Sequence, residues 1–296
     1  MKPPNCNGRD PHNLFTRLQS KARETLLTPR QIDSLRASNH HVLQNAGLVL
    51  GELRARLMAE DEGQWIQRIE RIRSNLCAST EQVLAPDYGA GDPAQKISNE
   101  AMQAGRATSE IVGQACQQFS KPPLWAFLLF KLVRQFKCES CVELGTCVGI
   151  SAAYQAAALE LNGKGQLVTL EGAPAFGAIA VRTLSSLGLG HRAQVKIGRF
   201  QDNLSAILTD LRTIDYAFID GHHEERATIA YFEQIAHHAA QPAIVVIDDI
   251  TWSDGMRRAW LRIWANPKID VALDLDKVGV CVLHADVKAR HRIVIR

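Results

Sequence analysis

Two different patterns of apolar and polar positions divide this chain. From residue 1 to about residue 118 the sequence is polar, β-branched residues are few, and apolar residues recur at helical spacing in 31–58 and 64–76. From residue 119 onwards, short apolar runs alternate with segments of helical spacing. The change predicts an α-helical N-terminal extension over 1–118 and a second domain over 119–296.

The extension carries signals for the ends of its helices. Thr28 followed by Pro29 predicts a first helical turn, because threonine caps a helix and proline is tolerated at its first position. Residues 85–93, rich in proline and glycine, predict a loop, and 94–119 predict further helix. Because apolar stripes must be buried, we expect the extension to pack on the second domain or on a second copy in a homodimer.

The sequence pattern of the second domain predicts a parallel sheet covered by helices on both faces. Short apolar strands that alternate with helices are typical of an α/β, Rossmann-like fold. The predicted strands are 140–145, 166–172, 193–198, 215–220 and 242–248, and the predicted helices are 149–161, 174–187, 202–212 and 223–239.

The predicted sheet ends in an antiparallel hairpin. Residues 270–276 and 278–285 form two apolar runs, and a link this short permits only antiparallel pairing. The sheet is therefore expected to have seven strands, five parallel and two in a C-terminal hairpin, unlike the six-stranded dinucleotide-binding fold.

Composition excludes several classes of protein. With 46% hydrophobic and 22% charged residues, the chain is not expected to be disordered, and a net charge of +3 argues against a nucleic-acid partner. The longest apolar run, 124–130, is far shorter than the roughly 20 residues of a membrane span, and the first residues contain no apolar leader. We therefore expect a cytoplasmic protein without a membrane segment. The cysteines are scattered, and the pair Cys138 and Cys141 lacks the further ligands of a zinc site.

A glycine-containing turn follows the first predicted strand. Gly145 and Gly149 would let the backbone turn tightly and approach a ligand. The dinucleotide pattern G-x-G-x-x-G is absent, since Cys147 stands at its middle glycine. Glu143 is expected to face the site, where it would repel a pyrophosphate and suit a cationic ligand such as a sulfonium amino acid.

The next two strands end in polar residues of the kind that bind a nucleoside. Glu171, before Gly172, is placed to accept both ribose hydroxyls. Gln201 and Asp202 follow the third strand and could contact an adenine edge. Glu171 could instead be a solvated loop acid, and Asp202 a helix cap.

The motif ELGTCVGIS, residues 143–151, resembles the first motif of class I S-adenosylmethionine-dependent methyltransferases. The closer resemblance is to small-molecule O-methyltransferases of the catechol and caffeoyl-CoA type, and it covers about residues 121–285. It implies S-adenosyl-L-methionine as cofactor and a small molecule as methyl acceptor, with the extension partly covering the acceptor pocket. The implied cofactor residues are Glu143, Gly145, Thr146, Gly149, Ser151, Glu171, Gly172, Gln201, Asp202 and Asp220.

Three aspartates follow the fourth and fifth strands. Asp220 and Asp248 end strands that we expect to be neighbours, so their carboxylates could converge on one hard cation such as Mg²⁺ or another divalent ion. Asp249 could join them only if the chain bends after Asp248. The resembled metal-dependent enzymes have an asparagine at the third position. Natural-product sugar methyltransferases have an acid there, as in this chain.

His223 is the candidate general base. It lies three residues after Asp220, where the sugar methyltransferases have the histidine of DGSH and this chain has DGHH. With an ordinary pKa near 6.5, histidine suits proton removal at neutral pH. The resulting hypothesis is metal-assisted O-methylation of a small molecule. A metal-free N- or C-methyltransferase and a catalytically silent partner with the same fold remain alternatives.

Overall fold

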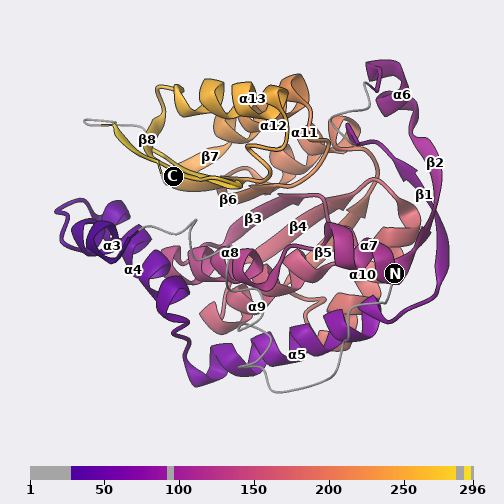
Figure 1. Ribbon diagram of the computed structural model, residues 1–296, viewed down its shortest axis with the longest axis horizontal. Coiled ribbons are helices and arrows are strands. Elements are labelled where there is room, and N and C mark those ends of the chain that lie inside the picture. The colour runs from indigo at the N-terminus through magenta and orange to yellow at the C-terminus, as the bar shows by residue number, and fades with distance from the viewer. Residues whose placement is uncertain (1–27, 92–96, 285–289, 295–296) are drawn as a thin grey trace.

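The computed structural model describes residues 28–91, 97–284 and 290–294. A central eight-stranded sheet has the order β10-β8-β9-β7-β6-β3-β4-β5, and a separate two-stranded sheet pairs β1 with β2. Helices cover both faces of the large sheet (Figure 1). The mixed α/β, Rossmann-like architecture predicted from the sequence is confirmed.

The five parallel strands fall where the apolar runs predict them. The side chains of β3, β4 and β6 are mostly buried at the centre of the sheet, which explains their many valine, isoleucine and leucine residues, whereas β5, at the sheet edge, is largely exposed. The strands are β3 (Ser140–Leu144), β4 (Gln166–Glu171), β5 (Ala193–Ile197), β6 (Ile214–Ile219) and β7 (Ala239–Ile247), and the helices between them are α9 (Ile150–Asn162), α10 (Pro174–Leu187), α11 (Phe200–Leu211) and α12 (Glu225–His237).

The C-terminal hairpin is also present, but the sheet has one strand more than predicted. Helix α13 (Asp254–Trp264) leads to β8 (Ile269–Leu275), which pairs antiparallel with β9 (Val278–Leu283). Strand β10 (His291–Val294) then adds to the outer edge of β8 in parallel. This four-residue segment begins with two polar residues, so it carries no apolar run by which the sequence could reveal a strand.

The extension begins as predicted and is mostly helical. Thr28 caps α3, since its Oγ1 accepts a hydrogen bond from the Gln31 amide at 3.3 Å, and Pro29 follows in the first turn. The helices before the sheet are α3 (Pro29–Arg36), α4 (His41–Ala55), α5 (Glu60–Cys77), α6 (Asn99–Ala104), α7 (Val112–Phe119) and α8 (Pro123–Phe136). Residues 1–27 of the predicted extension lie outside the described residues.

A β-hairpin interrupts the extension where the sequence predicts loop and helix. Strand β1 (Gln82–Asp87) pairs antiparallel with β2 (Arg106–Ile111), so the start of the predicted loop 85–93 and part of the predicted helix 94–119 are strands. Both strands are partly to fully exposed along most of their length. Their stability comes from pairing across a long connection, which local periodicity does not register.

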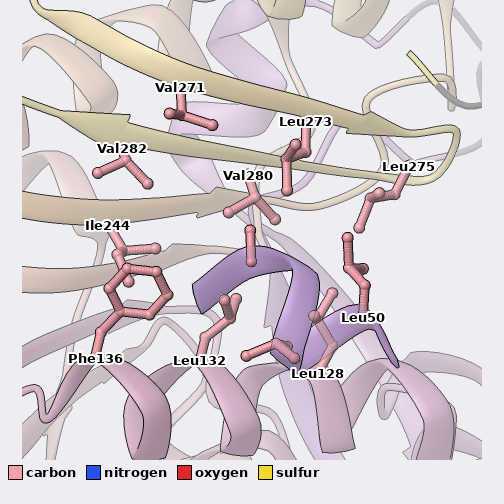
Figure 2. Close-up of a pocket in the computed structure, with 12 residues that line it drawn as sticks. Leu50, Leu128, Leu132, Phe136, Ile244, Val271, Leu273, Leu275, Val280 and Val282 are labelled. Carbon is pink, nitrogen blue, oxygen red and sulfur yellow. The ribbon is translucent and has the colours of Figure 1, made fainter. Parts of the chain in front are cut away.

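The extension packs directly on the second domain, as its apolar stripes predict. Figure 2 shows Leu50 of α4 and Leu128 of α8 facing Val280 of β9, around a small apolar cavity between helices and sheet. Helix α5 packs on α9, and α7 packs on α5. One continuous apolar core therefore includes side chains of both segments.

Candidate active site

The glycine turn after β3 packs tightly against the end of β6. Gly145 has a φ of +105°, and a Cβ atom at this position would lie 1.9 Å from the carbonyl oxygen of Asp220. Gly149, with a φ of +87°, begins α9 against the backbone of Ala180. Glycine is thus required at both positions, and the turn brings the cofactor motif into contact with the segment that carries the aspartates.

Glu143 does not face an open site, and this corrects the sequence-based expectation. Its side chain is fully buried, where Oε1 accepts a hydrogen bond from Gln155 Nε2 at 2.6 Å and Oε2 accepts one from Thr169 Oγ1 at 2.5 Å. Burial raises the pKa of Glu143 to about 7, although the hydrogen bonds from Thr169, Ser151 and Gln155 oppose the rise. Glu143 therefore supports the turn from beneath.

Two other predicted cofactor residues also direct their side chains into the protein. Thr146 and Ser151 are buried, and the hydroxyl of Thr146 lies 2.5 Å from that of Thr169. Their side chains stabilise the turn, which leaves the backbone of the turn as the part of it that can contact a ligand.

Glu171 joins the end of β4 to the glycine turn. Its Oε2 accepts a hydrogen bond from the Cys147 amide at 2.7 Å, and its Oε1 accepts one from the Ala173 amide at 2.8 Å. Burial raises the pKa of Glu171, and these backbone hydrogen bonds oppose the rise. The carboxylate is thus oriented beside the turn, at the position predicted for a ribose ligand.

Tyr88 is a neighbour of this region that sequence reasoning did not identify. A Cβ atom on Gly172 would lie 2.7 Å from the Tyr88 ring, so the aromatic side chain rests on the backbone just after Glu171. Tyr88 follows β1, in the extension. Nothing in the local pattern around Tyr88 indicates this contact, because the hairpin that brings it there was itself not predicted.

Gln201 and Asp202 lie in the first turn of α11, beyond the end of β5. Both are exposed, and Asp202 accepts a hydrogen bond from Arg199 Nε at 2.6 Å. The Tyr231 hydroxyl donates to Gln201 Oε1 at 3.3 Å. Because β5 is parallel to β4, these residues share the sheet edge that carries Glu171. Their contact with an adenine stays a prediction.

Asp220 and Asp248 follow neighbouring parallel strands, as predicted, and a lysine lies between them. Lys121 Nζ is 3.2 Å from Asp220 Oδ1 and also pairs with Asp248 Oδ2. The three side chains are only 12%, 11% and 3% exposed, in the order Lys121, Asp220 and Asp248. Lys121 comes from the short link between α7 and α8, and sequence reasoning did not assign it to the site.

The electrostatics of this cluster follow from burial and proximity. Burial would lower the pKa of Lys121, but the charges of Asp220, Asp248 and Asp249 outweigh it and raise that pKa. Burial raises the pKa of Asp220 well above its ordinary value, since Lys121 offsets it only in part. For Asp248, contact with Lys121 outweighs burial and lowers the pKa.

The chain bends after Asp248, as an approach of Asp249 requires. Asp249 has a φ of +51°, and His222 and His223 have φ values of +68° and +46°. Positive φ at non-glycine residues is uncommon and marks sharp turns at both strand ends. The acidic cluster is therefore formed by two loops, one after β6 and one after β7, which both turn sharply.

Of the two histidines, His223 faces the acids. Its Nε2 lies 3.8 Å from Asp220 Oδ1, whereas His222 Nδ1 lies 2.9 Å from the Tyr231 hydroxyl. Burial lowers the pKa of His223, and the charges of Asp249 and Asp248 oppose the fall. The choice of His223 rather than His222 as the base stays a prediction.

The acids as arranged do not fit the predicted divalent ion. Within residues 28–91, 97–284 and 290–294, no group of three acidic, histidine or cysteine side chains is placed to hold a metal. The Lys121 ammonium takes the position between Asp220 and Asp248 that an ion would need. The ligand set Asp220, Asp248 and Asp249 was predicted from strand ends alone, which could not include a lysine far away in sequence.

The extension reaches the same end of the sheet. The Ala90 amide donates to the carbonyl of His222 at 2.8 Å, and Trp252 Nε1 donates to the carbonyl of Gly91 at 3.4 Å. Trp252 is 49% exposed, so it is not a core residue. The segment after β1 therefore lies over the loops that carry the aspartates.

No helix in the described part of the chain has the length and apolar character of a membrane span.

Comparison with known proteins identifies a methyltransferase domain and a related O-methyltransferase. Residues 142–250 match the model of a methyltransferase domain family. The chain is 27% identical over 189 residues to the catechol O-methyltransferase of Niastella koreensis, covering 59% of this chain and 83% of the relative.

Solved structures show the same fold. The O-methyltransferase from Bacillus cereus in complex with SAH has a TM-score of 0.50 and 22% identity, over 57% of this chain and 84% of that chain. The SAH-bound methyltransferase PaMTH1 of Podospora anserina has a TM-score of 0.51 and 16% identity, over 78% of this chain and 98% of that chain. With its sheet order and glycine turn, the chain has the class I methyltransferase fold, and residues 142–250 carry a methyltransferase domain.

Proposed function

We propose that this enzyme transfers the methyl group of S-adenosylmethionine to a hydroxyl oxygen of a small molecule. The observation that carries the proposal is the contact between the glycine turn and the loop that carries Asp220 and His223. A cofactor held by the turn would lie next to a histidine able to accept a proton. The relative named as a catechol O-methyltransferase supports a hydroxyl acceptor.

The proposed cofactor site follows the ends of β3 and β4. The backbone of the glycine turn would hold the methionine part of the cofactor, and Glu171 would accept the ribose hydroxyls. Gln201 and Asp202, further along the same edge, would contact the adenine. Tyr88 adds an aromatic wall beside Gly172.

His223 is proposed as the base. A lowered pKa keeps its imidazole neutral at neutral pH, so Nε2 can accept the proton of the acceptor hydroxyl. The oxygen then attacks the sulfonium methyl in line, the carbon–sulfur bond breaks, and its electron pair stays on sulfur. The products are the methyl ether, S-adenosylhomocysteine and a protonated His223. Alignment of two bound reactants contributes much of the rate.

The sequence-based hypothesis adds Mg²⁺ or another divalent ion on Asp220, Asp248 and Asp249. Because Lys121 pairs with two of these acids, no step of the proposed mechanism passes through a metal. The homodimer stays a prediction, and so does the small-molecule acceptor. No contact among the described residues tests either of them.

The test is S-adenosylhomocysteine formation with a panel of phenols, catechols and sugar alcohols, alongside primary amines. We expect turnover with a hydroxyl acceptor, and His223→Gln should lower kcat about 10²–10⁴-fold, the usual contribution of a general base. The affinity for S-adenosylmethionine, measured by calorimetry, should change little. His222→Gln is the matched control because His222 faces Tyr231. Turnover with amines alone, or an unchanged kcat in His223→Gln, would contradict the proposal.

A further inference from the structure

The Lys121 ammonium occupies a position defined by two neighbouring strand ends. Its Nζ contacts a carboxylate oxygen after β6 and another after β7, and none of the three side chains is more than 12% exposed. Buried carboxylates in adjacent loops repel each other unless a cation compensates them. In this protein the compensating cation belongs to the chain itself.

We propose that Lys121 supplies the positive charge that a divalent ion would otherwise bring to Asp220 and Asp248, so that methyl transfer needs no divalent metal. The proposal rests on the proposed function, which supplies the reaction. It assigns to Lys121 the role of a positioning residue: Lys121 holds Asp220, whose Oδ1 lies 3.8 Å from Nε2 of His223.

The ammonium and a divalent ion cannot share this position. Mg²⁺ binds oxygen at about 2.0–2.1 Å and requires several ligands in octahedral arrangement. An ion on the same two carboxylates would lie within a few ångströms of Lys121 Nζ. At such separations two cations repel strongly in a buried site, where the effective dielectric constant is far below that of water.

The backbone keeps Lys121 at this place. Pro122 and Pro123 follow it, and a residue before proline is restricted to extended conformations. Pro123 begins α8, whose Phe127 and Phe130 are fully buried in the core. The lysine therefore extends from a fixed point, and withdrawal of the ammonium would leave two buried carboxylates without their cation.

Binding of Mn²⁺ is measured by the loss of the free-ion electron paramagnetic resonance signal and needs no acceptor, whereas turnover in EDTA is measured with a hydroxyl acceptor from the panel above. Wild-type protein saturated with S-adenosylhomocysteine should not bind Mn²⁺ up to millimolar concentrations, and turnover should persist in excess EDTA. One Mn²⁺ bound per chain at micromolar concentration, with turnover lost in EDTA, would overturn the proposal. Because this arm uses the wild-type protein, it does not depend on the folding of a variant.

Two variants separate the charge from the side chain. Lys121→Met removes the ammonium and should bind Mn²⁺ at least tenfold more tightly than the wild type, while Lys121→Arg should exclude Mn²⁺ as the wild type does. If Lys121→Met shows a native circular dichroism spectrum and still does not bind Mn²⁺, Lys121 is not what excludes the ion, and the proposal fails. Calorimetry with S-adenosylhomocysteine is read separately: absence of binding to the wild type would contradict the proposed function itself.

Discussion

The proposed cofactor half of the site, at the glycine turn and Glu171, and its acid half, at Asp220, Asp248 and Asp249, are built in different ways. At the ends of β3 and β4, the Glu171 carboxylate accepts hydrogen bonds from the Cys147 amide of the glycine turn, 24 residues earlier, and from the Ala173 amide, two residues later. At the ends of β6 and β7, the cluster is completed by Lys121, which lies about a hundred residues earlier than Asp220. A local motif can therefore reveal the first half, whereas the second depends on a contact that only the tertiary fold creates.

This difference determines how each half should respond to substitution. In the cofactor half, backbone geometry fixes the site, so single changes should affect cofactor affinity and local stability. In the acid half, charge compensation fixes it, so the Lys121 variants should change which cations bind. The three predictions below test the cofactor half, in order of decreasing effect.

The largest effect is expected for Gly145→Ala. The added Cβ would lie 1.9 Å from the carbonyl oxygen of Asp220, and the φ of +105° is unfavourable for alanine. Backbone must move to relieve the clash, which should lower the free energy of unfolding by about 2–4 kcal/mol and abolish measurable cofactor binding. Urea unfolding and calorimetry measure the two effects.

Gly163→Ala is the matched control for Gly145→Ala. Gly163 also has a positive φ, +73°, but a Cβ there would meet no atom within 4 Å. Gly163→Ala should lower the free energy of unfolding only through the unfavourable positive φ of alanine, by about 1–2 kcal/mol, and should leave cofactor affinity unchanged. Equal losses in the two variants would show that close packing on Asp220 does not matter, and the two halves would then not be coupled through this contact.

The sequence predicted the elements and the glycine turn better than the arrangement of the side chains around Asp220 and Asp248. Buried parallel strands leave uninterrupted apolar runs, and the glycines were recognisable because the turn needs them. The hairpin of β1 and β2, strand β10 and Lys121 were missed because each depends on partners distant in sequence. Glu143 was assigned a wrong orientation, since a strand-end acid can point inward when Thr169 and Gln155 hydrogen-bond to it.

An intermediate effect is expected from the buried Glu143 as pH changes. Its pKa of about 7 in the folded protein lies above the ordinary value of 4.5, so the folded state binds this proton more tightly than the unfolded state. The resulting stabilisation is fully present below pH 4.5 and is lost as pH rises through 7. Glu143→Gln should therefore be more stable than the wild type at pH 8.5, by up to about 3 kcal/mol, and the difference should shrink towards pH 5.

Urea unfolding at pH 5, 7 and 8.5 measures this difference. Glu139→Gln is the control, because Glu139 is an exposed acid at the other end of β3, paired with Lys164 on the surface. A stability difference between Glu143→Gln and the wild type that stays constant from pH 5 to 8.5 would show that Glu143 does not take up a proton in this range. The buried network beneath the glycine turn would then be ionised throughout.

The smallest of the three effects is expected for Glu171→Ala, and it tests most directly whether the cofactor half is what it is proposed to be. The carboxylate is already oriented by the amides of Cys147 and Ala173, so it can accept ribose hydroxyls without reorganisation. Loss of these charge-assisted hydrogen bonds should weaken S-adenosylmethionine binding by about 1.5–3 kcal/mol. Glu139→Ala, at the opposite end of the sheet, should leave the affinity unchanged. Because Glu171 also supports the turn, Glu171→Gln is compared with Glu171→Ala. The glutamine amide can still accept one hydrogen bond, so this variant should retain part of the affinity for S-adenosylmethionine. Calorimetric affinities that are equal for the wild type and both Glu171 variants would remove this residue from the site and place the ribose elsewhere along the edge.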